Sequence, residues 1–505
     1  METKRSGRPD RGHMQRPNGD AHARDATATL LLVSDALGTP AYPRGVFQYT
    51  TGLLPVLKAA GWSTALVIEE PGEEAPPGSN PSQVEAVARL ANIYQYLSGS
   101  HYRSELREHN WRRRFSYERR AQLQRLVKRA GGVLPRRRLL DPGKVMMPNQ
   151  PARLAFIPEK LRAFASVDWF IPLGRFYTDS VMRAVYNVRP PRLNARAFDA
   201  VIIDTPLYVE LDARPGVPII GVIHDLVPIQ DPTMGAGWRR LFMRKLEATL
   251  AQATRLVFVS DATRQDADRH FPGLLDRVPS YILHPIASPD LCAAAEQTKP
   301  SRRPDDGGLC PGKPYMVALV SFEQRKNTAV LVQAWQKIGD RADLVIIGQM
   351  NDEFRKFLNA RRGANIKNLG LVSDAEKIAL ICGARALVMP SHAEGFGIPI
   401  IEAGVLGTPV ICSDIAVFRE VTAGFAQYFD PYSVESLVRA VERALDHPSS
   451  ADTDAQCLRR HCLSRYTAAT ALPVFAAALG GKRPSSFIPA TASEPPSSSH
   501  CFEAP

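Results

Sequence analysis

The chain has 505 residues, with 45% hydrophobic and 23% charged side chains, which is typical of a globular protein and excludes a fibrous or wholly disordered chain. This length exceeds what one hydrophobic core usually holds, so we expect two domains. The net charge is +12, no apolar run reaches membrane-spanning length, and the seven cysteines lack the two-residue spacing of zinc or redox sites. These features predict a cytosolic protein with reduced thiols.

The two ends and one internal segment differ in composition from the rest. Residues 1–26 and 481–505 are predicted to be disordered tails, and the first has no apolar segment that could serve as a signal peptide. Residues 101–140 hold thirteen Arg and Lys against three Glu, a net charge of +10. In this basic insertion Trp111 and Phe115 interleave with arginines, so we expect contact with an anionic membrane surface. A solvated insertion is the alternative.

Short runs of Val, Ile and Leu alternate with helical stretches along the first half of the chain. Such runs predict strands buried on both faces of a parallel sheet and joined by crossover helices. In chain order they are TLLLVSD (29–35), TALVIE (64–69), DAVIID (199–204), VPIIGVIHD (217–225) and RLVFVS (255–260). Residues 27–295 are therefore predicted to form an N-terminal Rossmann-like domain that carries the basic insertion.

A stretch rich in Pro, Gly and charge, residues 296–314, is predicted to be a linker to a second domain of the same kind. Strand-like runs then recur as YMVALV (315–320), DLVIIG (343–348), ALVMPS (386–391) and PVICSD (409–414). We expect the second Rossmann-like domain over 315–460 and a terminal helix over 461–480. Ligands of open α/β sheets bind beyond the carboxyl ends of the strands, so the predicted site is a cleft between the domains.

The stretch PSHAEGFGIPIIEAGVLGTPVI, residues 390–411, places Glu394 in a loop and Glu402 about one turn into the following helix, whose first turn suits Pro399. Gly395 and Gly397 allow close approach of the backbone, and the helix N-terminus favours an anion. Carboxylates beside a diphosphate can accept hydrogen bonds from sugar hydroxyls. The stretch therefore predicts a site for a nucleoside-diphosphate sugar, and the alternative is an ordinary tight loop with two structural glutamates.

The pattern PS-x-x-EGFG-x-P-x-x-EA, followed by GTPVI, resembles retaining glycosyltransferases of the GT-B class, in the group 1 (family 4) set that includes many bacterial mannosyltransferases. The resemblance is convincing from about residue 221 to 431, weak before residue 60 and absent from 70 to 195. It implies two Rossmann-like domains and transfer of a hexose with retention of anomeric configuration. Further matching segments are SFEQRKN (321–327), NLGLVSDAEKIALICGARALVMPS (368–391), GVIHDLVP (221–228), FVSDATRQD (258–266) and, more weakly, PRGVFQYTTGLL (43–54).

The resemblance implies roles in donor binding for residues that match the family's motifs. Glu402 would bind the ribose hydroxyls, and Glu394 would hold hydroxyls of the transferred sugar. Arg325 and Lys326 would clamp the diphosphate, as a charged bidentate pair can. The remaining donor-binding residues would be the loop residues Gly395, Phe396, Gly397 and Ile398, the first three through their amides.

Two further positions depart from the family or lie in the other domain. Ser321 stands where many members have a second Arg, so Arg325 would replace it. His224 would face the sugar and acceptor, which makes Glu394, His224 and Lys326 the expected catalytic residues. Gly45 would belong to the first glycine-rich loop. The alternatives are a satisfied histidine at a strand end and a plain turn glycine.

No cofactor or metal is expected. The Asp-x-Asp matches at Asp266–Asp268 and Asp452–Asp454 do not follow a strand of the cleft, so we interpret them as solvated carboxylates. Arg325 and Lys326 would instead stabilise the charge on the departing diphosphate. The resemblance implies GDP-mannose as donor, with a glycan or lipid-linked acceptor in bacterial polysaccharide assembly. The expected location is the cytoplasm, peripheral on the inner face of the plasma membrane.

Other functions of the same architecture are less well supported. A nicotinamide dehydrogenase would need G-x-G-x-x-G after residue 35, where the chain reads ALGTPAYPRG. No lysine can be assigned to pyridoxal phosphate, as a phosphorylase would require. A basic nucleic-acid-binding protein with an α/β fold remains the alternative because of the Arg-rich segment, although no nucleic acid is expected as a partner.

Overall fold

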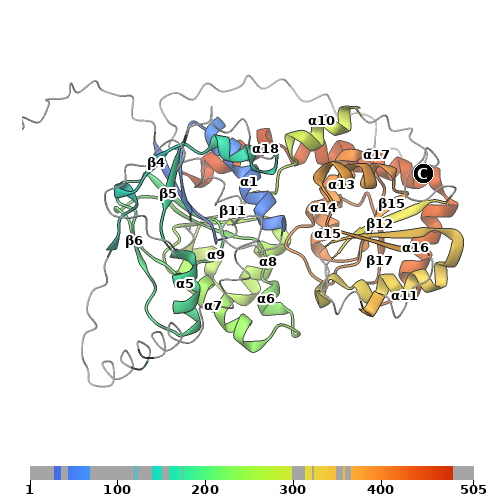
Figure 1. Cartoon of the computed structure of the whole chain (residues 1–505), viewed down its shortest axis with the longest axis horizontal. Helices are drawn as coiled ribbons and strands as arrows, with labels where there is room; N and C mark the ends of the chain where they lie inside the picture. Colours follow the sequence, from blue (N-terminus) through green and yellow to red (C-terminus); the bar gives the residue numbers. More distant parts are fainter. Residues whose placement is uncertain are drawn as a thin grey trace, which may run out of the picture.

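The computed structural model describes residues 28–35, 44–68, 119, 122, 139–149, 159–174, 176–297, 313–320, 323–348, 356–358 and 365–480. Both predicted tails, nearly all of the basic insertion and most of the predicted linker lie outside these residues. Figure 1 shows an N-terminal body, blue to green, beside a C-terminal body, yellow to red. The two predicted Rossmann-like domains are therefore confirmed at the level of architecture.

The N-terminal body is built on one eight-stranded sheet. Neighbouring strands are parallel except for the pairing of the last two. All five strands predicted in this half are present. In order across the sheet the strands are β11 (Ser280–Ile282), β10 (Arg255–Phe258), β9 (Ile219–Ile223), β7 (Ala200–Ile203), β1 (Thr29–Val33), β2 (Ser63–Ile68), β5 (Trp169–Pro172) and β4 (Met147–Pro148).

Both faces of this sheet are covered, which explains the continuous apolar runs. Leu30 and Leu32 of β1 join the core that contains Leu54 of α1. Leu31 and Val33 join a separate core, to which α5 also contributes. The helices of this body are α1 (Arg44–Ala59), α5 (Phe176–Val185), α6 (Val227–Gln230), α7 (Ala236–Leu250), α8 (Asp261–His270), α9 (Leu274–Arg277) and a 3-10 helix (Glu159–Ser166). A small separate sheet consists of β3 (Leu139–Leu140), β6 (Arg192–Asn194) and β8 (Glu210–Asp212).

The C-terminal body repeats the arrangement with a six-stranded parallel sheet. All four predicted strands are present, with β14 and β17 added at the edges. Its strands are, in order, β14 (Ile366–Gly370), β13 (Asp343–Ile347), β12 (Tyr315–Leu319), β15 (Ala386–Met389), β16 (Val410–Ser413) and β17 (Gln427–Phe429). Its helices are α11 (Thr328–Ile338), α13 (Asp374–Gly383), α14 (Ile398–Leu406), α15 (Ala416–Thr422) and α16 (Val434–Asp446).

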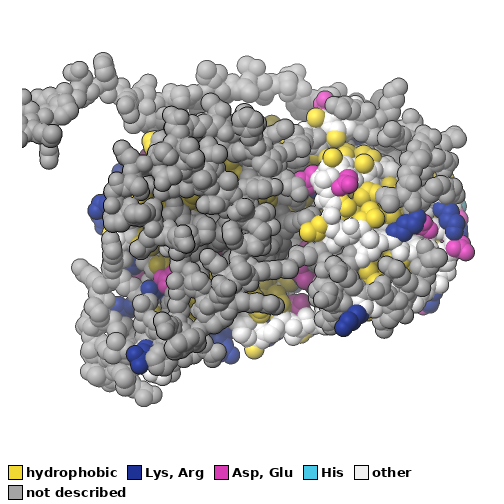
Figure 2. All heavy atoms as spheres, viewed as in Figure 1, with side chains coloured by type: hydrophobic (Ala, Val, Ile, Leu, Met, Phe, Trp, Pro, Cys, Tyr) yellow, Lys and Arg dark blue, Asp and Glu magenta, His cyan; other side chains and the backbone are white. Residues whose placement is uncertain are grey.

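In Figure 1, α11 lies below the sheet and α13 above it; α16 contributes to the same core as α11, and α14 to the same core as α13. The same division separates two cores, one holding Met316 and Leu344 and the other holding Val317 and Val345. In Figure 2, hydrophobic side chains gather on the visible surface of the C-terminal body, and several Asp and Glu side chains lie toward the N-terminal body.

The last helices differ from the predicted domain boundaries. Instead of one terminal helix over 461–480, α17 (Pro448–Arg465) runs through residue 460 and α18 (Ala468–Ala478) follows. The break arises because Thr467 and Thr470 form a capping box that starts a new helix. Helix α17 packs on α14, whereas α18 returns to α1 and β11 of the N-terminal body. Helix α10 (Pro289–Gln297), expected to end the first domain, packs on α14 instead.

Within the part of the chain that the structure describes, no helix combines the length and the apolar character needed to cross a membrane.

Candidate functional site

The two bodies touch at the glycine-rich loop between β15 and α14. A Cβ atom on Gly395 would lie 2.0 Å from the carbonyl oxygen of His224, so only glycine permits this approach. The carbonyl of Gly395 accepts hydrogen bonds from Ser260 Oγ at 2.7 Å and Thr263 Oγ1 at 3.2 Å. Gly397 has φ 102° and precedes the first residue of α14. The loop predicted to bind the donor is therefore also a contact between the domains.

Glu394 lies at the centre of a charged cluster in this loop. Its Oε1 is 2.5 Å from Lys326 Nζ and accepts a hydrogen bond of 2.7 Å from Ser391 Oγ, and its Oε2 is 2.9 Å from an Arg325 guanidinium nitrogen. Burial alone would raise the pKa of Glu394, but the charges of Lys326 and Arg325 outweigh it and hold this pKa at about 2. The structure thus brings three of the predicted residues together as an ionised cluster.

Arg325 has acidic neighbours on several sides. Its Nε is 2.6 Å from Glu323 Oε2, and its side chain is only 11% exposed. Burial acts to lower the pKa of Arg325, but Glu394, Glu323 and Asp225 raise it above its ordinary value. Asp225, which immediately follows His224, is buried, and burial raises the pKa of its carboxyl. Arg325 therefore balances negative charge from both domains where they meet.

His224 follows β9 of the N-terminal body and lies against the Glu394 loop, as its close approach to Gly395 requires. Its Nε2 is 2.8 Å from the carbonyl oxygen of Asp204, a bond in which only the nitrogen can donate. Its ring packs edge-on against Tyr49 of α1, with centroids 4.8 Å apart. The histidine is thus held by its own domain and presented at the domain boundary.

Glu402 lies in α14, buried and 7% exposed. Its Oε1 accepts hydrogen bonds from Lys377 Nζ at 2.6 Å and from Gln48 Nε2 at 3.2 Å. Lys377 belongs to α13 of the same body, whereas Gln48 belongs to α1 of the other. Sequence reasoning missed both partners, because a helical lysine and a glutamine outside any motif give no signal of burial or of distant contact.

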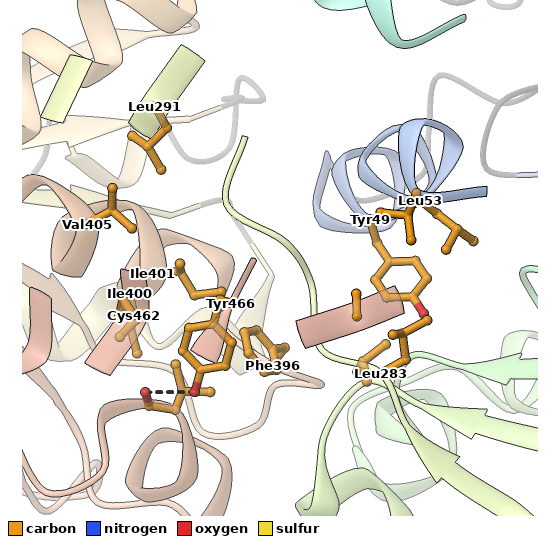
Figure 3. Packing of buried hydrophobic residues seen from close by; sticks show 14 of the residues in the cluster. Tyr49, Leu53, Leu283, Leu291, Phe396, Ile400, Ile401, Val405, Cys462 and Tyr466 are labelled. Carbon is orange, nitrogen blue, oxygen red and sulfur yellow. Dashed lines mark hydrogen bonds between the residues drawn. The ribbon is translucent and has the colours of Figure 1, made fainter. Parts of the chain in front are cut away.

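The remaining predicted residues divide between the contact of the two bodies and the core. A Cβ on Gly45 would lie 3.7 Å from Ile398 Cδ1, so these two predicted positions are adjacent across the domains. Phe396 is buried, with its ring centroid 5.4 Å from that of Tyr466 and 5.5 Å from that of His284. Figure 3 shows Phe396 next to Tyr466 on the side facing Tyr49 and Leu283. Its side chain is therefore part of the apolar contact, and only its backbone remains for a ligand.

The two Asp-x-Asp matches lie on helices and are engaged elsewhere. Asp266 in α8 pairs with Arg269, and Asp452 in α17 is 3.0 Å from Arg385. Among the described residues, no group of three or more His, Cys, Asp or Glu side chains is arranged as a metal site. Ser321 lies outside the described residues.

Comparison with known proteins agrees with this geometry. The family model described as glycosyl transferases group 1 matches residues 304–458. Over 235 residues the chain is 28% identical to the serotype-specific mannosyltransferase WbdA of Escherichia coli, covering 44% of this chain and 29% of that protein. Over 139 residues it is 47% identical to the O-antigen chain mannosyltransferase RfbU of Salmonella typhimurium, covering 26% of this chain and 39% of that protein. The chain thus spans less than a third of the length of WbdA.

Two solved structures share the fold. The Anabaena protein Alr3699/HepE, in complex with UDP and glucose, aligns with a TM-score of 0.51 over 90% of this chain and 100% of its own, at 12% identity. The sucrose-phosphate synthase of Thermosynechococcus elongatus aligns with a TM-score of 0.50 over 89% and 97% of the two chains, at 15% identity. The predicted GT-B fold is confirmed, and residues 304–458 match the family model of glycosyl transferases group 1.

Proposed function

We propose that this protein transfers a hexose from a nucleoside-diphosphate sugar to a glycan or lipid-linked acceptor, with retention of anomeric configuration. The observation that carries the proposal is the cluster of Glu394, Lys326 and Arg325 beside the domain contact at Gly395. Two cations and a carboxylate beyond the carboxyl ends of parallel strands suit a diphosphate joined to a sugar.

The proposed mechanism depends on the negative charge that develops on the leaving group during transfer. The bond between the sugar's anomeric carbon and the diphosphate oxygen breaks, and negative charge accumulates on the departing diphosphate. Lys326 and Arg325 stabilise that charge, so the reaction needs no metal. The acceptor hydroxyl attacks from the same face, its oxygen bonds to the anomeric carbon, and its proton passes to the departing phosphate. Glu394 holds the sugar's hydroxyls, and His224 faces the sugar from the other domain.

For the donor we propose GDP-mannose, and for the pathway bacterial polysaccharide assembly. The support is the mannosyltransferase names of the relatives WbdA and RfbU. The UDP complex of HepE makes a UDP-sugar the donor to be compared with it. We further propose a cytoplasmic enzyme that attaches peripherally to the inner face of the plasma membrane through the basic insertion 101–140, a segment with a net charge of +10.

The test is a panel of GDP- and UDP-activated hexoses incubated with the purified chain, with release of the nucleoside diphosphate as the readout. We expect turnover with one nucleotide class and, by NMR of the product, the anomeric configuration of the donor. An inverted product would overturn retention, and no release from any donor, with or without glycan acceptors, would overturn the proposed function. Sedimentation with anionic but not neutral vesicles, reversed by salt, tests the membrane attachment.

A further inference from the structure

The carboxylate of Glu402 is bound asymmetrically by two domains. Its Oε1 takes both hydrogen bonds, one from Lys377 Nζ at 2.6 Å and one from Gln48 Nε2 at 3.2 Å. Among the described residues none donates a hydrogen bond to Oε2. One oxygen is thus bound to the protein, while the other keeps its capacity to accept hydrogen bonds from a ligand.

The Lys377–Glu402 pair is too buried to be explained by stability alone. The side chains of Lys377 and Glu402 are 11% and 9% exposed, and the pair lies where α13 packs against α14. Removing two charges from water costs about as much as their attraction returns, so well-packed apolar residues would hold the helices equally well. The ion pair instead fixes the direction of the carboxylate, because Lys377 Nζ holds one of its two oxygens.

Gln48 makes the position of the Glu402 carboxylate depend on contact between the two bodies. It lies in the first turns of α1, in the N-terminal body, and its hydrogen bond to Glu402 exists only when the two bodies are together. Gly45, three positions earlier, approaches Ile398 in the first turn of α14. The N-terminal part of α1 therefore covers the first turns of α14.

We propose that Lys377 and Gln48 are positioning residues that hold Oε1 of Glu402 and thereby present Oε2 to the 2′- and 3′-hydroxyls of the donor ribose, with Gln48 making this recognition depend on closure of the cleft. The inference rests on the proposed function, because it takes Glu402 as the residue that meets the donor nucleotide. What it adds is the pair of residues that orient this glutamate.

The test uses calorimetric titration with GDP and, in a parallel arm, UDP, each compared with its 2′,3′-dideoxy form. For the wild-type chain we expect the ribose form of the preferred nucleotide to bind at least about tenfold more tightly than the dideoxy form, the value of one or two hydrogen bonds to a carboxylate. The measured quantity is this ratio of affinities, because a general loss of folding lowers both affinities and leaves the ratio unchanged.

Lys377→Met should reduce the ratio to about twofold or less, and Lys377→Arg should retain part of it, since a guanidinium can still donate to Oε1. The matched control is Lys367→Met. Lys367 is 3.0 Å from Asp343, which begins β13 at the amino end of the strands, away from the site, so the ratio should stay at its wild-type value. Gln48→Leu should reduce the ratio by about threefold, from the other domain.

The outcomes distinguish failure of the proposed function from failure of the roles given to Lys377 and Gln48. If the wild-type chain binds neither GDP nor UDP, the proposed function and this inference are both overturned. If it binds one of them and Lys377→Met melts normally with an unchanged ratio, only the inference is wrong. Tighter binding by Lys377→Met would show that Lys377 competes with the ribose, which also overturns it. If Lys377→Met fails to fold, Lys377→Arg and Gln48→Leu decide the test. An unchanged ratio of affinities in both of these variants would overturn the inference.

Discussion

Glu394 lies in the loop that precedes α14, and Glu402 lies within α14, yet the two carboxylates have different surroundings. Glu394 is bound by Ser391, Arg325 and Lys326, all within the C-terminal body. Glu402 is bound by Lys377 of that body and by Gln48 of the other. The first cluster is therefore complete within one domain, whereas the second is complete only when the domains meet. Under the proposed function, the groups that stabilise charge are assembled within one domain, whereas we expect nucleotide recognition to depend on contact between the domains.

The most severe way to break the first cluster is Lys326→Ala. Lys326 is the proposed stabiliser of the departing diphosphate, so we expect kcat to fall by at least about a hundredfold, or roughly 3 kcal/mol, when this cation is removed. Steady-state transfer kinetics measure it. Lys313→Ala, which removes an exposed cation 3.1 Å from Asp340, is the control and should keep wild-type kinetics. Near-wild-type kcat in Lys326→Ala would place the diphosphate clamp elsewhere.

Gly395→Ala should break the second cluster while leaving the first in place. The added methyl would overlap the carbonyl oxygen of His224, so the domains must separate and the Gln48–Glu402 bond must be lost. We expect kcat/KM to fall by about ten- to a hundredfold, with Tm of the C-terminal body little changed. Small-angle scattering should show a larger radius of gyration. Gly237→Ala in α7, where an added Cβ would have no neighbour within 4 Å and φ is not positive, controls for the loss of a glycine as such. Unchanged scattering and kinetics would contradict this contact.

Titration with acid tests whether the cluster around Glu394 holds this carboxylate in its ionised form. The folded-state pKa of Glu394, about 2, lies below the ordinary value of 4.5, so its ionised form favours the folded state. This contribution is fully present above pH 4.5 and is lost as the pH falls through about 2; it amounts to about 2–3 kcal/mol. Urea unfolding at pH 5, 4 and 3 of the wild type and Glu394→Gln measures it. The stability of the wild type should fall more steeply between these values, and equal slopes would show that the cluster does not hold the ionised form.

The smallest expected effect is that of a chelator. Because Lys326 and Arg325 supply the positive charge, EDTA should change the rate of transfer by less than about twofold. Addition of manganese to chelated protein is the control. Loss of activity in EDTA followed by recovery in manganese would show that transfer requires a metal. It would contradict the proposed role of Lys326 and Arg325.

Local patterns in the sequence were enough to predict the strands and the Glu394 loop. Runs such as TLLLVSD are apolar on both faces, and such runs form buried strands whatever their distant neighbours are. Glu394 and Lys326 were both assigned to the donor site, and loops at the carboxyl ends of parallel strands meet at one edge; their direct bond became known only from the structure. Pro399 and the glycines before it likewise determine where α14 begins, since their backbone preferences are local.

The contacts between the two bodies could not be predicted from the sequence. The bond from Gln48 to Glu402, the approach of Gly395 to His224 and the return of α18 to α1 depend on how two separate sheets are placed. No periodicity of one segment encodes that placement, because a local pattern specifies which face of a helix or strand is buried and not which distant element covers it. Lys377 shows the same limit: its burial and its partner follow from the packing of α13 on α14.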